Sequence, residues 1–251
     1  MAHPAYPLRT PRLLLRPVTL GDLDDVHAWQ HRPDVVRWMA GAAPRTRVES
    51  LASVTAMAGE DALRAEGDCL TLAVVSDTRV IGAVELVWRS AADRTAELGY
   101  VFHPGHGGRG LATEAAGALL DWGFGEFGLH RVIARCHADN EPSARLMARL
   151  GMRREARHVR SYRFRGGWAD QLVYAVLADE WRRAQDGLTG SRASSTVSGR
   201  AFMSPRTRRR PGSRPWSAAR AGCRTRSSRR GAGGGTASGS APSRSRASPG
   251  R

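Results

Sequence analysis

Lysine is missing from this sequence of 251 residues, because all 39 of its Lys and Arg positions are arginine. Some enzymes form a Schiff base through a lysine, and P-loop proteins hold a phosphate with one. The absence excludes both kinds of site. A phosphate would have to be held by arginine, by hydroxyl groups or by backbone N–H groups.

Acidic residues are missing after Asp186. All 23 acids lie at or before that position together with 24 of the arginines, so the first 186 residues are nearly neutral. The other 15 arginines occur among Ser, Gly, Ala and Pro with few large apolar residues. Such a segment cannot bury enough apolar surface to offset its chain entropy. We therefore expect residues 187–251 to form a disordered tail.

Two interpretations of this tail stay open. Its charge suits a tether to nucleic acid or to another acidic surface, so nucleic acid would be a partner through the tail alone. Alternatively, a GC-rich gene, which would also account for the missing lysines, has been read past its proper end or out of frame.

Cysteines are few, and long apolar runs are absent. Cys69, Cys136 and Cys223 lie far apart, a spacing that suggests neither a disulfide framework nor a metal site. The eight histidines show no ligand spacing either, so no metal is expected. No run approaches the roughly 18 apolar residues of a membrane span. These absences favour a soluble, cytoplasmic protein with no membrane partner.

The first 186 residues read as alternating strands and helices. A strand at 12–18 and a helix from Thr19 to about His31 are followed by a helix over about 47–66. Runs at 70–75, 80–88 and 95–102 have the tight connections of an antiparallel meander. A helix from about 111 then leads to a strand at 131–136, an order that predicts a parallel pair. A helix at 140–151 and strands near 153–164 and 171–177 complete an α/β fold with a mixed sheet of about seven strands.

Residues 103–115, HPGHGGRGLATEA, form a glycine-rich loop that opens directly into a helix. Gly105, Gly107 and Gly110 satisfy the GxGxxG pattern of dinucleotide sites, but about 100 residues of a different order precede them. A P-loop would need lysine where Leu111 stands. Backbone N–H groups near glycines, together with the helix dipole, suit a pyrophosphate without lysine or metal.

Several segments together resemble one family. AELGYVFHP, GGRGLATEA and, about 30 residues later, NEPSARLMARLGM match in order and spacing the GNAT superfamily of acyl-CoA-dependent N-acetyltransferases. The opening LRTPRLLLRPVTLGDLDDVHAW and the late SYRFRGGWADQLVYAVLADEW look most like its ribosomal-protein alanine and serine N-acetyltransferase subgroup. The resemblance covers residues 8 to about 183. It implies a GNAT domain over residues 8–186, with a mixed seven-stranded sheet flanked by helices, and acetyl-CoA as cosubstrate.

The resemblance also implies which residues hold acetyl-CoA. In the family, the strand before the loop ends in a bulge, so free amides at Tyr100 to His103 would face the pantetheine arm and the thioester. The loop and the first helical turn would hold the pyrophosphate, although Gly107 stands where the family has Gln or Arg. The expected cofactor-binding residues are Val101, Phe102, His103, Gly107, Gly108, Arg109, Gly110, Ala112, Thr113 and Asn140.

Two catalytic residues follow from the same resemblance. An ammonium group must lose a proton before it attacks a thioester, and Glu97 stands where several relatives carry a catalytic carboxylate. A surface or salt-bridge role is the alternative for Glu97, and Asp170 is a second candidate for the base. Many members protonate the leaving thiolate with a tyrosine where this chain has Met147. Ser143 would take that role or orient a water, or it satisfies backbone donors at its helix start.

The leading hypothesis is an acetyl-CoA-dependent N-acetyltransferase acting on a primary amine, either a protein N-terminus or a small amine. Met147 leaves a second interpretation open, an acyl-CoA-binding module without turnover. A third is a nucleic-acid-associated protein tethered by its arginine-rich tail. The sequence determines neither the acceptor nor the oligomeric state.

Overall fold

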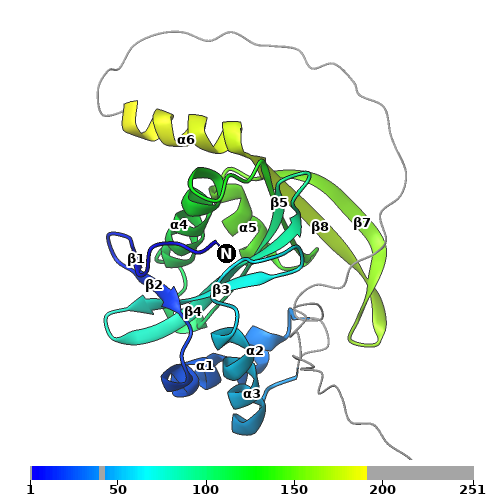
Figure 1. Ribbon diagram of the computed structural model, residues 1–251. Coiled ribbons are helices and arrows are strands. Elements are labelled where there is room, and N and C mark those ends of the chain that lie inside the picture. Colours follow the sequence, from blue (N-terminus) through cyan, green and yellow to red (C-terminus); the bar gives the residue numbers. More distant parts are fainter. Residues whose placement is uncertain (1, 40–42, 191–251) are drawn as a thin grey trace, which may run out of the picture.

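The computed structural model describes residues 2–39 and 43–190, and within them one sheet of eight strands runs in the order β1-β2-β3-β4-β5-β6-β8-β7 (Figure 1). The strands are β1 (Leu8–Arg9), β2 (Leu14–Pro17), β3 (Cys69–Ser76), β4 (Arg79–Ser90), β5 (Thr95–Phe102), β6 (Arg131–His137), β7 (Arg153–Phe164) and β8 (Gly167–Leu177). The helices are α1 (Leu23–Gln30), α2 (Pro33–Val36), α3 (Arg47–Ala58), α4 (Leu111–Gly125), α5 (Glu141–Arg149) and α6 (Ala178–Gly190), with 3₁₀ turns η1 (Leu20–Asp22) and η2 (Pro104–His106). None of these helices is long and apolar enough to cross a membrane.

The sheet is mixed, as the sequence predicted. Its neighbouring strands are antiparallel except β5 and β6, which are parallel. It has eight strands rather than about seven, because β1 pairs with β2 through Leu8–Leu15 and Arg9–Leu14. A strand of two residues is too short to leave an alternating pattern in the sequence.

Helices cover both faces of the sheet. Strand residues such as Leu72 and Leu86 pack with Leu119 of α4 in the main hydrophobic core. On the opposite face, Ala83 packs in a second cluster that includes Val54 of α3. Because side chains alternate along a strand, β3 and β4 contribute to both layers.

Three predicted boundaries were wrong. The helix expected over 47–66 ends at Ala58, because Gly59 closes it and the chain then turns to pair Leu63 with Ala2. The last strand begins at Gly167, not near 171. Helix α6 continues through Gly190, so the first four residues assigned to the tail are helical. The four-residue α2 was not predicted, since it is too short for a helical period.

Residues 191–251 of the predicted tail lie outside the described part of the chain. We expect a chain that ends at Gly190 to keep its Tm and its acetyl-CoA affinity, because the removed segment has no acids and few apolar residues. A chain that ends at Leu177 is the matched control. It should lose stability, because Trp181 of α6 is 6% exposed and its Nε1 donates to Asp121 at 2.7 Å. A large loss of Tm or affinity in the longer chain would contradict this expectation.

Candidate functional site

The sheet opens at its centre, where β5 and β6 part. The two strands pair only at Thr95–Arg131, Ala96–Val132 and Glu97–Ile133. Beyond that point β5 remains paired with β4, and β6 remains paired with β8. In the described part of the chain no strand fills the gap between their facing edges. We call this gap the wedge, and its backbone polar groups are available to a ligand.

The predicted bulge at Tyr100–His103 is not where the strand opens. The β4–β5 register is continuous from Ala96 to Phe102, and the N–H of His103 donates to the carbonyl of Ile81 at 2.8 Å. The register shifts near β5 fall in β4 instead. The separation of β5 from β6, rather than a bulge, therefore leaves the β5 edge beyond Glu97 without a strand partner, and on that edge the backbone groups of Phe102 face the wedge while those of Val101 and His103 face β4.

The glycine loop presents hydrogen-bond donors at the start of α4. Gly108 and Gly110 adopt φ values of +76° and +77°, which favour glycine. The described residues offer no backbone acceptor to the N–H groups of residues 108–113, a span that includes Arg109 and Ala112. The hydroxyl of Thr113 is buried without a partner in the same part of the chain. Free amides, an unpaired hydroxyl and a helix N-terminus suit an anionic group such as a pyrophosphate.

Arg12, in the turn between β1 and β2, donates hydrogen bonds to this loop and to α4. Its Nη1 donates to the carbonyl of Arg109 at 2.9 Å, and its Nε donates to Glu114 at 2.7 Å. Thr10 donates to the same carboxylate at 2.6 Å. Burial opposes the charge of Glu114, but these hydrogen bonds hold its pKa below the ordinary value. Sequence reasoning missed Arg12, because about 100 residues separate it from the loop and no pattern connects them.

A group of polar side chains meets across the wedge. The Tyr100 hydroxyl on β5 lies 2.7 Å from Oγ of Ser143 on α5. Asn140 caps α5, as predicted, by accepting the N–H of Ser143 at 3.3 Å. Burial raises the pKa of Tyr100, and it raises the pKa of the Cys136 thiol to about 11 although a hydrogen bond with Ser143 lowers it in part. Both groups are therefore neutral near pH 7, and they flank the Ser143 hydroxyl. Met147 is fully buried in the core.

Glu97 lies where the wedge begins, and it is ion-paired. Its Oε2 accepts Nε of Arg89 at 3.0 Å and lies 3.7 Å from Nη1 of Arg135. The side chain of Glu97 is 11% exposed. The salt-bridge role considered for this residue is therefore present. Both contacts use Oε2, and the described residues give Oε1 no further partner.

Asp170 serves the β7–β8 hairpin. Its carboxylate accepts the N–H of Arg160 at 2.8 Å and Nε of Arg157 at 2.9 Å. These two hydrogen bonds lower the pKa of Asp170. They hold β7 where its register shifts between His158 and Tyr162. Asp170 therefore has a structural role, in which its carboxylate accepts a hydrogen bond from nearby backbone.

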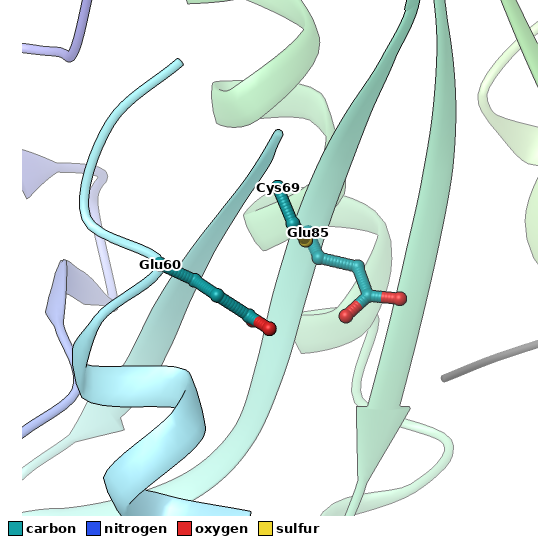
Figure 2. A group of neighbouring side chains, drawn as sticks. All are labelled: Glu60, Cys69 and Glu85. Carbon is teal, nitrogen blue, oxygen red and sulfur yellow. The ribbon is translucent and has the colours of Figure 1, made fainter. Parts of the chain in front are cut away.

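An acidic cluster lies on the face of the sheet that carries Glu97. Glu60, Cys69 and Glu85 have potential ligand atoms within 4.8 Å of one another, and Figure 2 shows Glu60 pointing from the segment after α3 toward the strands. The Thr71 hydroxyl donates to Glu60. Glu85 lies over Gly99, where a Cβ would come within 2.4 Å of its Oε1. Sequence reasoning missed this cluster, whose members come from three separate segments.

One hollow lies near α6, and another lies beside the glycine loop. One of about 650 Å³ is bounded by Phe124, Trp181 and Arg182 near α6, and it contains no residue of the predicted site. A smaller one of about 260 Å³ lies beside the loop, where His103 and His106 face Arg79. The candidate site is therefore defined by free backbone groups rather than by either of these hollows.

A sheet that parts at its centre beside a glycine-rich helix start defines an acyltransferase of the GNAT class. The family model described as an acetyltransferase (GNAT) domain matches residues 12–153. The chain belongs to this family and is an N-acetyltransferase.

Individual relatives agree with this assignment. The uncharacterised N-acetyltransferase YnaD of Bacillus subtilis (strain 168) is 33% identical over 180 residues, which cover 69% of this chain and 98% of YnaD. The crystal structure of a GNAT-family acetyltransferase from Bacillus anthracis has a TM-score of 0.61 and 30% identity, covering 68% of this chain and 98% of that one. RimL, a ribosomal L7/L12 alpha-N-protein acetyltransferase solved in complex with coenzyme A, has a TM-score of 0.60 and 17% identity, covering 68% of this chain and 97% of RimL. The last likeness shows the fold alone. The GNAT resemblance and the α/β fold are confirmed, whereas the ribosomal-protein subgroup stays a prediction.

Proposed function

We propose that this chain transfers the acetyl group of acetyl-CoA to a primary amine in the wedge, the acceptor being a protein N-terminus or a small amine. The observation that carries the proposal is the parting of β5 and β6 beside the unpaired N–H groups that begin α4. Such a wedge gives a thioester a place between two strand edges, and the loop gives its pyrophosphate a set of donors.

The residues present fit acetyl-CoA. The N–H groups of Gly108 and Gly110 and the unpaired hydroxyl of Thr113 would bind the pyrophosphate. Backbone groups at the free edge of β5 would bind the pantetheine arm. Asn140, already engaged as a cap, would contribute its remaining amide donors from the other side of the wedge.

The chemistry needs a base on one side of the thioester and a proton donor on the other. The ammonium group first loses a proton to the base, which releases it to solvent. The neutral amine nitrogen then forms a bond to the acetyl carbon, the carbon–sulfur bond breaks, and the second proton lost by nitrogen ends on the CoA sulfur. We assign the first role to Oε1 of Glu97. Ser143 donates a hydrogen bond to the sulfur as charge develops there. The hydroxyl of Tyr100, which stays protonated, lies 2.7 Å from Ser143 Oγ and 3.2 Å from the Ser143 carbonyl; when it donates to Oγ, the serine hydrogen is left for the sulfur.

Ser143→Ala should lower kcat by about tenfold to 100-fold at unchanged acetyl-CoA affinity, since one positioned donor to a developing charge has an effect near this size. Tyr100→Phe should lower kcat less. The double variant should be no worse than Ser143→Ala, because Tyr100 acts through Ser143. Steady-state kinetics and titrations of all four proteins measure this cycle. Fully additive losses would contradict the assigned coupling.

The function is tested by incubating the protein with acetyl-CoA and a panel of peptide N-termini, amino acids and polyamines. Free CoA thiol and the acetylated acceptor are both quantified. We expect acceptor-dependent thiol release matched by one acetyl group gained per acceptor. Tight acetyl-CoA binding without such release from any acceptor would instead support a binding module without turnover.

A further inference from the structure

An aromatic wall lies at the end of β6. The ring of His137 is centred 4.7 Å from that of Phe164, 6.3 Å from that of Tyr162 and 5.3 Å from that of Trp38. These side chains come from β6, from β7 and from the residues after α2. Gln171, paired in register with His137, is 4% exposed, and the described residues give its Nε2 no hydrogen-bond partner. A buried donor left unpaired destabilises a fold unless a ligand or water accepts from it.

Two exposed arginines, Arg37 and Arg165, flank this wall, and we call them the arginine rim. The Cζ of Arg37 lies 4.6 Å from the centre of the Trp38 ring, and Arg165 lies 5.9 Å from that of Phe164. Arg165 also donates to the carbonyl of Val36 at 3.4 Å, which joins the hairpin tip to α2.

The charge of the rim is not cancelled locally. In the described part of the chain, no rim arginine forms an ion pair with a carboxylate, whereas the neighbouring Arg153 and Arg157 are paired. Residues 153–165 contain six arginines and a single acid, Glu155. Two further acids adjoin this surface: the exposed Asp139 lies 3.8 Å from His137, and Asp170 accepts the N–H of Arg160 and pairs with Arg157. The β7–β8 hairpin extends beyond the body of the molecule (Figure 1), so this positive surface faces solvent.

The arginine rim lies beside the wedge, and carboxylates lie nearer the point where the wedge begins. His137 ends the strand whose Ile133 pairs with Glu97, so the wall begins on the side where β5 and β6 have separated. Glu85 and Glu97 lie on one face of the neighbouring strands, opposite Gly99 and Val87 respectively. Three carboxylates, Glu60, Glu85 and the arginine-paired Glu97, therefore lie near the thioester position, whereas the rim carries arginines that form no ion pair in the described residues.

We infer that the acceptor is an acidic polypeptide. Its N-terminal amine would lie beside Glu85 and Glu97, and the carboxylates that follow would bind the arginine rim. This deepens the proposed function and rests on it. Arginine forms charge-assisted, two-point hydrogen bonds with carboxylates, and a guanidinium stacked on a ring is already oriented for them. A polyamine carries positive charge along its length and would be repelled at the rim. An alternative explanation is that arginines on a free strand edge discourage aggregation. This does not account for Arg37, which follows α2 and is not on a strand edge.

The test uses two peptides with the same first two residues, one continuing with Asp and Glu and the other with Gln and Asn. We expect kcat/KM for the acidic peptide to be about tenfold higher at low salt, mainly through KM, which is the size that two exposed ion pairs provide. The advantage should shrink as NaCl is raised. Arg37→Gln with Arg165→Gln should reduce the ratio to near one with kcat little changed. Arg183→Gln is the matched control. It removes an arginine from α6, away from the arginine rim, and should leave the ratio unchanged.

The outcomes separate the two proposals. Equal kcat/KM for both peptides, or rapid acetylation of spermidine with neither peptide used, would overturn the acidic acceptor while the transferase activity stands. Failure of every acceptor would overturn both. Fluorescence anisotropy with the labelled acidic peptide and CoA adds a readout without turnover, and binding that ignores the rim substitutions would also overturn the inference.

Discussion

Gly110→Asp is expected to abolish acetyl-CoA binding while the protein stays folded. Gly110 is the residue before α4, and its N–H is one of the donors without an acceptor in the described residues. An aspartate there would place a carboxylate where the pyrophosphate is expected. The dissociation constant should rise at least 100-fold, because the phosphate would lose donors and meet a negative charge in their place.

Gly110→Ala is the matched control for this substitution. Gly110 has a φ of +77°, so any side chain strains the backbone by about 1 kcal/mol, and a Cβ would lie 3.6 Å from Nη2 of Arg12. Both variants should therefore lose a similar few degrees of Tm, but only the aspartate should lose binding. Titration calorimetry and thermal unfolding measure the two effects. Normal acetyl-CoA affinity in Gly110→Asp would place the phosphate site elsewhere.

Glu97→Gln is expected to lower turnover about 100-fold or more near pH 7 while acetyl-CoA affinity holds. A positioned base contributes on the order of 10²- to 10⁴-fold. Glutamine keeps the shape of the side chain and an oxygen for Arg89, so the surroundings change little, but it cannot take a proton.

Arg135→Gln tests whether Glu97 matters only as an ion-pair partner. It removes the 3.7 Å contact and retains the carboxylate, so turnover should fall less than tenfold. Tm is measured for both variants, since an incompletely paired buried charge is destabilising. Near-wild-type turnover in Glu97→Gln with a confirmed acceptor would exclude Glu97 as the base.

Local patterns in the sequence predicted the elements that frame the site. Short β-rich runs with tight connections predicted β3, β4 and β5, the cap Asn140 marked the start of α5, and four glycines marked the loop before α4. Each of these signals lies within a few residues of the feature it specifies. The order of strand, helix and strand also predicted the parallel pair of β5 and β6.

Contacts between distant segments could not be predicted. Arg12 meets the glycine loop, and Tyr100 meets Ser143, only because the sheet brings those elements together. The pairing of Glu97 with Arg89 and Arg135 depends on strand register, which a single sequence leaves undetermined. The position of the expected bulge was wrong for the same reason, since β5 is freed by the departure of its neighbour rather than by its own conformation.

The central claim is that the glycine loop and the wedge together bind acetyl-CoA rather than a dinucleotide. Calorimetric titration of the full chain with acetyl-CoA and, separately, with NAD tests it most directly. We expect acetyl-CoA to bind with one site per chain and NAD to give no binding heat, because the loop lies beside a parted mixed sheet and not in a Rossmann half. Binding of NAD without binding of acetyl-CoA would contradict the account.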